Sequence, residues 1–268
     1  MIIYAAKVKI VFKFAQIFFE TLTMRHRFFV LFFSIAAFWG CDSPDAPDFF
    51  KSIGDEVTQE WHFDSLITVF RINDAFDVSL VKDTTEYAIV TCGKNLIDKI
   101  KWEITAPNTV EFSNDNACRI VRNYEGVPKI EIHYTYSHLN VYVNGSGRVH
   151  SSDSVDVRRV VFTERIGSLD IITNAPEFVL EVWFGTGRYY VRGKTDCFRC
   201  EPRYSAIVDA SQLSVKKAFV DNYSTGDVYV NPTDSLTAKI FWTGDIIYSG
   251  NPGINILENP GKGGLIKK

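Results

Sequence analysis

Two aspartates in equivalent positions of a sequence repeat are the residues best placed to do chemistry. Asp227 and Asp245 each follow a glycine, within the segments 224–228 and 242–246. If these segments stack as neighbouring strands, about 4.8 Å apart, the two carboxylates become neighbours. Such a pair can act as acid and base, bind calcium, or cleave a glycosidic bond. The alternative, which we favour, is that both aspartates accept hydrogen bonds from turn amides.

The histidines and the C-x-x-C motif do not form a catalytic or metal-binding set. His133 and His138 are five residues apart, so in one strand they face opposite sides and cannot share a metal. Cys197 and Cys200 would also point to opposite faces, with Cys200 in the core. The chain lacks the hydrolase, zinc-protease, Walker and dinucleotide motifs. We therefore expect no enzymatic activity, no catalytic residue, no metal and no cofactor.

The N-terminal segment reads as an export signal rather than as part of a fold. A basic start at Met24–Arg27 precedes the apolar run Phe28–Trp39, which ends at Gly40 and Cys41. A helix of this length spans about 18 Å, whereas a bilayer core is about 30 Å thick. The pattern resembles a bacterial lipoprotein signal with Cys41 as the lipidated residue. Residues 1–40 are then the signal region, and Met24 is a candidate for the true start.

The segment after the lipidated cysteine reads as a tether, which we place at residues 41–55. Two prolines and three aspartates within residues 42–48 cannot build a core. Acidic residues at this place resemble signals that export lipoproteins to the outer face of some outer membranes, and a plain linker is the alternative. We expect a cell-envelope protein anchored to the outer membrane through Cys41. In that oxidising compartment Cys92 and Cys118 could form a disulfide.

Composition and charge limit the class of protein. The chain has 268 residues, of which 46% are hydrophobic and 23% are charged, as in a globular protein. Its net charge is −3, and residues 1–40 hold five basic residues against one acidic residue, so the remainder is more acidic. A nucleic-acid-binding protein would instead show a basic face, and we expect no nucleic-acid partner.

The body of the chain alternates apolar and polar residues in the way that strands do. Runs such as Ile67–Ile72, Tyr87–Val90 and Ile130–Tyr134 are rich in β-branched and aromatic residues and end at turn-forming residues. The only helix candidate is a single turn near 96–98. We predict an all-β protein.

A short motif of a small residue, a glycine, a polar residue and an aliphatic residue recurs through the second half. The pivot residues, at which we expect the chain to turn, are 147, 167, 187, 205, 226, 244 and 263, so the period is near 20 residues. Such a period predicts a β-solenoid with one sharp turn per coil, where glycine would supply positive φ. We expect a single-stranded, right-handed, β-helix-like solenoid, preceded by irregular strands of the antiparallel type. A β-sandwich of regular hairpins is the alternative.

Several segments resemble the auto-transporter adhesin head GIN domain family. They include 56–60, 93–100, 144–147, 247–252 and 262–266. The resemblance covers residues 56–268 and implies a secreted, lipidated, β-solenoid-like protein. Only one repeat keeps a full Gly-Ser-Gly, so the coils that depart from it should be less regular.

The repeat also predicts a face that could bind a partner. The residue two after each pivot should point inward: Val149, Leu169, Tyr189, Ile207, Val228, Ile246 and Leu265. The next residue should then point outward: His150, Asp170, Tyr190, Val208, Tyr229, Ile247 and Ile266. We expect Tyr190, Tyr229 and Ile247 to share one face with Arg188, Asp227 and Asp245 beside them, as a candidate binding face. The alternative is that other strands or a second molecule cover it.

Three functions remain open from the sequence. The first, which we favour, is a non-catalytic surface lipoprotein whose solenoid binds a glycan or a protein. The second is a polysaccharide-acting enzyme that uses Asp227 and Asp245. The third is a structural component of the cell envelope. The sequence does not identify the ligand or the oligomeric state.

Lipidation at Cys41 is directly testable. If Cys41 carries acyl chains, the protein should partition into detergent and incorporate a fatty-acid analogue, because each buried CH₂ contributes about 0.8 kcal/mol to membrane binding. Cys41→Ala should release the protein from the membrane fraction and remove the label. Unchanged fractionation of this variant would contradict the lipoprotein interpretation.

Overall fold

The computed structural model describes residues 53–116 and 127–268, which belong to one compact unit, Ile53–Lys268. Four sequence predictions lie wholly or largely outside the described residues: the signal region, Cys41, the tether and Cys118. Among the described residues, no helix is long and apolar enough to cross a membrane.

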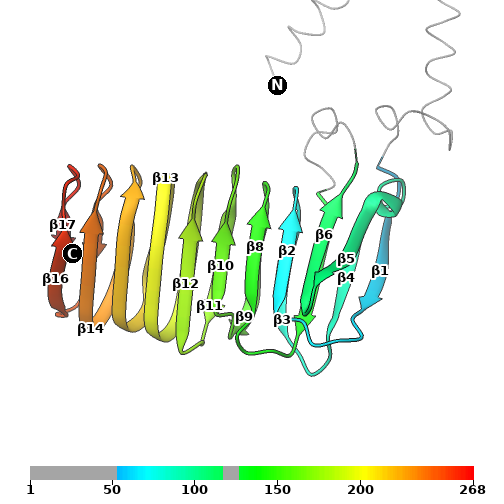
Figure 1. Ribbon diagram of the computed structural model, residues 1–268, viewed down its shortest axis with the longest axis horizontal. Helices are drawn as coiled ribbons and strands as arrows, with labels where there is room; N and C mark the ends of the chain where they lie inside the picture. Colours follow the sequence, from blue (N-terminus) through cyan, green and yellow to red (C-terminus); the bar gives the residue numbers. More distant parts are fainter. Residues whose placement is uncertain (1–52, 117–126) are drawn as a thin grey trace, which may run out of the picture. The chain divides into compact units, whose positions relative to one another are not determined.

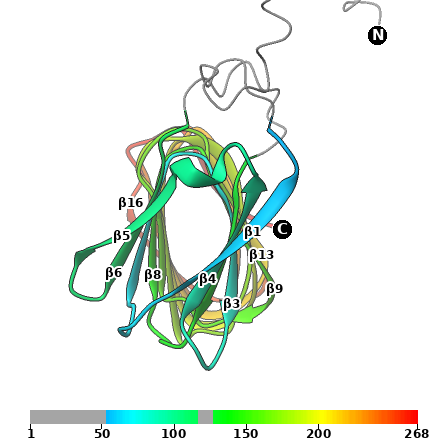
Figure 2. The same cartoon turned by 90° about the vertical axis from the view of Figure 1, so that its right-hand side faces the viewer.

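Two broad faces of parallel strands build the unit (Figures 1 and 2). The first face contains, in spatial order, β5 (Ile100–Ala106), β6 (Thr109–Asn114), β2 (Val69–Asn73), β8 (Asn140–Asn144), β10 (Arg159–Phe162), β12 (Glu177–Val182), two stretches of β13 (Thr186–Ser224), the end of β14 (Val228–Ile240) and β16 (Gly253–Glu258). The second face contains β1 (Glu56–His62), β4 (Tyr87–Gly93), β7 (Lys129–Tyr134), β3 (Asp77–Lys82), β9 (Arg148–Val155), β11 (Ser168–Thr173), two other stretches of β13, the start of β14, β15 (Ile246–Tyr248) and β17 (Leu265–Lys267).

This arrangement confirms the predicted all-β solenoid, and the sandwich alternative is wrong. Equivalent residues pair in parallel across a coil of about 20 residues, as Leu169 pairs with Tyr189. The predicted antiparallel strands at the N-terminal end are also present, because β1 pairs with β4, β4 with β7, and β5 with β6. The predicted helical turn is the 3-10 helix η1 (Ile97–Lys99).

The N-terminal coils do not stack in chain order. On the first face, β2 lies between β6 and β8, and on the second face β3 lies between β7 and β9. The coil built by β6 and β7 therefore packs on the outer side of the coil built by β2 and β3. The chain then returns past that coil to begin β8.

The core lies between the two faces and follows the strand alternation. Inward-facing residues such as Leu169, Tyr189, Val228 and Ile246 are fully buried. Aromatic residues in equivalent positions stack from coil to coil, as Phe178 and Phe198 do with ring centroids 6.0 Å apart. Burial of such apolar surface stabilises each coil only through its neighbours, as in other solenoids.

Glycines occupy the turns that lead from the first face to the second, which we call the glycine turns. A Cβ on Gly187 would lie 2.0 Å from the carbonyl oxygen of Gly167, and a Cβ on Gly244 would lie 2.0 Å from that of Gly226. None of these four has a positive φ, so the predicted reason for glycine was wrong. At Gly187 and Gly244, glycine is required because the backbone of the preceding turn approaches too closely for a side chain.

One predicted pivot was placed one residue too early. A Cβ on Gly226 would approach the carbonyl of Ala206, so Ala206, and not Ser205, takes the pivot position of its coil. This repeat has no glycine to mark the turn, and the two small residues Ser205 and Ala206 stand next to each other. Register within this coil is therefore shifted by one residue from the prediction.

Two buried tyrosines differ in how their hydroxyls are satisfied. Tyr189 is fully buried, and its hydroxyl has no hydrogen-bond partner within the described part of the chain. Tyr134 is equally buried, but its hydroxyl donates to Asp156 Oδ1 at 3.0 Å and accepts from the Asp156 amide at 3.1 Å. Burial raises the pKa of both hydroxyls, so both stay protonated at neutral pH.

This contrast predicts opposite effects of removing the two hydroxyls. Tyr189→Phe should leave the free energy of unfolding unchanged or raise it by about 1 kcal/mol, because it removes an unpaired buried polar group. Tyr134→Phe should lower it by about 1–3 kcal/mol, because it leaves the Asp156 groups without their partner. Urea or thermal unfolding measures both. Equal destabilisation by the two variants would show that the Tyr189 hydroxyl is satisfied in the folded protein.

Candidate functional site

The predicted binding face lies along the outer side of the second face. Tyr229 pairs with Ile247 on the next coil, and Tyr190 pairs with Asp170 on the preceding coil. Tyr190 is 39% exposed, and Tyr229 and Ile247 are half-buried. The structure thus places these three side chains on one face, but one coil separates Tyr190 from Tyr229.

The residue on that intervening coil is Asp209 and not Val208, which corrects the predicted column. Val208 is fully buried and pairs with Val228, whereas Ile207 is only half-buried. Asp209 pairs with Tyr229 and so occupies the outward position. The error has the cause described above, because a pivot at Ala206 moves every following residue of that coil by one place.

The carboxylates of Asp227 and Asp245 accept hydrogen bonds from backbone amides of the turns and do not form a facing carboxylate pair. The amide of Asp245 donates to Asp227 Oδ1 at 2.9 Å, and the amide of Gly264 donates to Asp245 Oδ1 at 2.7 Å. Each carboxylate therefore satisfies the backbone of the next coil, as the turn interpretation predicts. Tyr229 donates to Asp227 Oδ2 at 3.4 Å, and its pKa is raised by burial and by that neighbouring charge. These contacts indicate a structural role for both aspartates.

A shallow hollow opens beside Tyr190. It is lined by Asp170, Tyr190, Arg192, Asp209 and Gln212. The Arg192 guanidinium forms an ion pair with Asp170, and Asp209 Oδ1 accepts from the amide and hydroxyl of Ser211. Arg188 is exposed on the same face. This hollow offers one aromatic ring beside the Arg192–Asp170 ion pair, and the buried Arg192 Nε has no hydrogen-bond partner among the described residues.

A second exposed surface follows the glycine turns and carries aromatic rings. We call it the aromatic edge and define it by Trp183, Phe184, Tyr204, Tyr223, Phe241 and Trp242. Phe184 and Tyr204 stack at 5.0 Å, Tyr223 and Phe241 stack at 4.1 Å, and Trp242 meets Tyr204 edge-on at 6.2 Å. Its four most exposed rings, Trp183, Phe184, Tyr204 and Trp242, are 43%, 55%, 43% and 47% exposed.

The aromatic edge was not predicted from the sequence, although its signal is present there. Each of its residues precedes the pivot of its coil by two to four positions, as Trp242 precedes Gly244 and Tyr223 precedes Gly226. Only the residues after each pivot were assigned to faces. The stacking of coils brings the residues before the pivots into a row as well, because every coil passes through the same turn.

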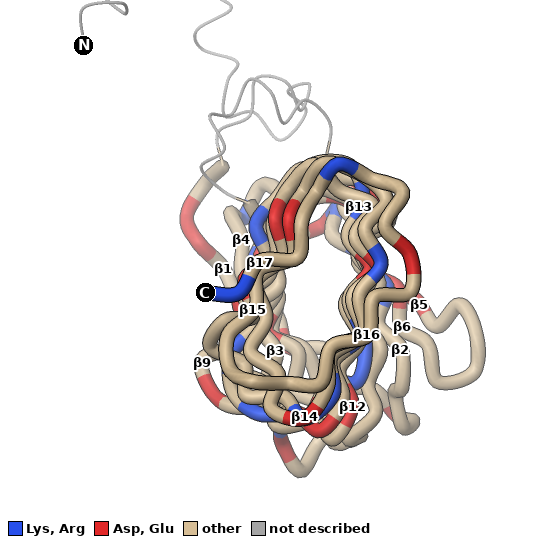
Figure 3. Tube along the Cα trace, turned by 90° about the vertical axis from the view of Figure 1, so that its left-hand side faces the viewer, with Lys and Arg blue, Asp and Glu red and all other residues tan. Residues whose placement is uncertain are grey.

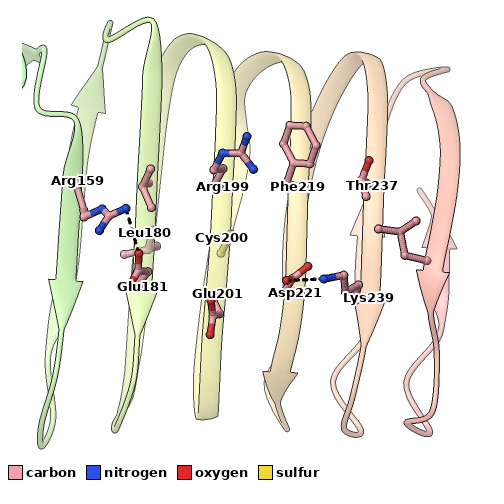
Figure 4. Close-up of a pocket in the computed structure, with 12 residues that line it drawn as sticks. Arg159, Leu180, Glu181, Arg199, Cys200, Glu201, Phe219, Asp221, Thr237 and Lys239 are labelled. Carbon is pink, nitrogen blue, oxygen red and sulfur yellow. Dashed lines mark hydrogen bonds and ion pairs between the residues drawn. The ribbon is translucent and has the colours of Figure 1, made fainter.

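The outer side of the first face carries a groove of paired charges (Figure 4). Glu181, Glu201 and Asp221 face outward on successive coils, as the register of β12, β13 and β14 shows. Their partners are Arg159 for Glu181 at 3.6 Å, Arg203 for Glu201, and Lys239 for Asp221 at 3.2 Å. Because every carboxylate has a basic partner, this groove does not form a cation site. Figure 3 shows both signs of charge around the coils.

His150 lies in the outward column of the second face, next to Asp170, and its Nε2 is 3.3 Å from Asp77 Oδ1. His133 bonds Asp83 through Nδ1 and Glu131 through Nε2, both at 2.8 Å, while His138 is exposed. Hydrogen bonds from Thr84 and His133 lower the pKa of Asp83. No group of metal-ligating side chains occurs among residues 53–116 and 127–268.

The described cysteines are free thiols. Cys200 is buried and Cys197 is half-buried, as predicted for opposite faces of one strand. Cys92 is also buried, and burial raises its pKa to about 11. None of these thiols has the exposure and lowered pKa of a reactive cysteine.

The chain belongs to the family described as "Putative auto-transporter adhesin, head GIN domain", whose model matches residues 67–252. The match spans most of the solenoid and confirms the resemblance seen in the sequence. Among curated proteins, none matches this chain.

Solved structures of similar fold include proteins from Bacteroides and Parabacteroides species. A Bacteroides fragilis protein named as a putative adhesin has a TM-score of 0.68 and 19% identity, and the match covers 80% of this chain and 97% of that one. A Parabacteroides distasonis protein named as a putative lipid binding protein has a TM-score of 0.54, 19% identity and the same coverage. A second P. distasonis protein, named as a putative adhesin, has a TM-score of 0.51 and 16% identity, covering 80% and 98%. At these identities the likeness establishes the fold alone.

Proposed function

We propose that this protein is a non-catalytic, adhesin-like lipoprotein of the cell envelope that binds a glycan through the aromatic edge. The observation that carries the proposal is a row of four exposed aromatic rings along one edge of the solenoid. Soluble proteins rarely expose contiguous apolar surface of this kind without a partner. Family membership supports the adhesin-like part of the proposal.

The geometry of the edge suits a long, partly apolar ligand. Stacking hides one side of Phe184 and Tyr204 against each other, so their outer sides and ring edges remain for contact. Tyrosine and tryptophan combine a flat apolar body with one polar atom, which fits surfaces that are neither fully apolar nor fully polar. The indole N–H of Trp183 donates a hydrogen bond to Glu181 Oε2 at 3.0 Å, and this contact fixes the ring in place. A ligand that runs along the solenoid axis could contact several coils at once.

The enzymatic alternative has less support. Both aspartates on which it depended accept backbone hydrogen bonds from the next coil. A general acid or nucleophile needs a carboxyl group that is free to meet the substrate. The lipid anchor at Cys41 remains part of the proposal on the sequence pattern alone, and it would hold the solenoid at a membrane surface.

Glycan binding and its location can be tested together. The full chain in detergent is applied to an array of bacterial and host-type glycans, and the strongest binder is titrated by calorimetry. Trp242→Ala and Tyr204→Ala should weaken binding at least tenfold, because truncated aromatic anchors typically cost about 2 kcal/mol or more. The matched control is Tyr190→Ala, since Tyr190 is 39% exposed and Tyr204 is 43% exposed. This control should bind as the unmodified protein does.

The other outcomes each contradict a stated part of the proposal. Loss of binding in Tyr190→Ala alone would move the site to the hollow on the second face. Binding to phospholipid vesicles or to a protein, with no glycan bound, would replace the ligand class. Cleavage of a bound glycan that is lost in Asp227→Asn would establish the enzymatic alternative. No binding in any of these assays would favour a structural role in the envelope.

A further inference from the structure

The two ends of the solenoid differ in how their edge strands and core residues are covered. At the N-terminal end, the antiparallel strands β4 and β5 pair with the last parallel strands of the two faces, β7 and β6, and β1 pairs in turn with β4. Leu96 and Ile97, in and beside η1, are buried in the core there. The outermost strands carry charged residues, which discourage pairing with another chain: Glu56, Glu60, Lys101 and Glu103.

The C-terminal end exposes residues that stand in core positions. Ile254 pairs with Leu236 and Ile256 pairs with Ala238, and these two partners are fully buried. Ile254 and Ile256 are nevertheless 41% and 52% exposed. Within the described part of the chain no further strand covers them. Their exposure is thus that of an inward column whose last members are covered by no other described strand.

The backbone at this end is also available for pairing. From Gly253 to Ile256, β16 pairs regularly with β14, and its register shifts only beyond Ile256. This regular stretch contains no charged residue, and Glu258 is the first one. The outer N–H and C=O groups of the stretch have no strand partner among residues 53–116 and 127–268. An apolar, uncharged edge strand of this kind promotes pairing with another strand.

We infer that the C-terminal end is the interface of a symmetric tail-to-tail dimer. β16 and β17 lie on opposite sides of the same final coil (Figure 3), so a cover must supply two strands at once. A single peptide strand could pair with only one of the two edges. A second copy of the chain, related by a two-fold axis that passes through both faces, presents its own β16 and β17 edges to these two strands at the same time. β16 then pairs antiparallel with its counterpart, β17 does the same, and both faces continue across the interface.

The sequence of β16 is self-complementary in this arrangement. In a register centred on Asn255, Ile254 lies opposite Ile256 of the partner subunit, with both side chains in the shared core. Directly opposed residues of an antiparallel pair point to the same side of the sheet. No two like charges of β16 face each other in this register, because Glu258 lies opposite Pro252 of the partner subunit. The contact is closed by the two-fold axis, so assembly stops at two copies and does not form fibres.

The dimer is tested by measuring the mass of the full chain in solution. Size-exclusion chromatography with light scattering, with the detergent mass subtracted, should give twice the chain mass for the unmodified protein. Ile256→Lys should shift this to a single chain mass. Small-angle scattering should show that the dimer is lengthened along one axis, as an end-to-end contact requires.

Ile104→Lys is the matched control. Ile104 lies at the opposite end in β5 and is 53% exposed, against 52% for Ile256. This variant should remain dimeric, and circular dichroism should show both variants folded, since both side chains are already half in solvent. A single chain mass for the unmodified protein would overturn the inference. Dimers that survive Ile256→Lys, or that Ile104→Lys breaks equally, would place the contact elsewhere and overturn it as well.

Discussion

The structure depends on how closely successive glycine turns approach one another. At Gly187 and Gly244, the position of a Cβ would lie 2.0 Å from the carbonyl oxygen of the preceding turn. No side chain can occupy that space at Gly187 and Gly244, so these two positions require glycine, whereas Ala206 stands in the equivalent position of its own coil. Backbone hydrogen bonds hold the paired parallel strands about 4.8 Å apart. The turns that join these strands must stack at the same spacing, and this leaves no room for a Cβ at Gly187 or Gly244.

Close stacking converts a 20-residue period into columns of like residues. Inward columns fill the core, and polar side chains near the turns bond from one coil to the next. Buried Asn222 donates through Nδ2 to the carbonyl of Gly244, and buried Ser224 donates through Oγ to that of Ala206. On the outer side, the carboxylates of Asp227 and Asp245 accept hydrogen bonds from amides of the next coil. Turn stacking also produces the aromatic edge, because aromatic residues that precede the pivots of successive coils line up. The aromatic edge is at the same time a candidate binding site.

Periodicity predicted the parts of the fold that repeat, and it failed where the repeat is interrupted. Six of the seven inward positions, including Tyr189 and Val228, were assigned correctly, because each has a glycine two places before it. The Ile207 assignment was wrong, because Ala206 gives no signal that distinguishes it from Ser205. The placement of β2 between β6 and β8 could not be predicted, since strand order depends on which edges meet in space. The role of Asp227 was foreseen as a turn acceptor, whereas the row of exposed rings was overlooked.

The most direct test of this account is the stability of two alanine variants of neighbouring turns. At Gly244 a Cβ would meet backbone at 2.0 Å, whereas at Gly264 it would lie 3.7 Å from its nearest neighbours, an ordinary contact. The account predicts that Gly244→Ala lowers the free energy of unfolding by at least about 2 kcal/mol, while Gly264→Ala changes it by no more than about 1 kcal/mol. Urea unfolding of both variants measures the difference. Equal stability of the two variants would contradict the claim that the stacked solenoid depends on turn backbones that approach too closely for a Cβ.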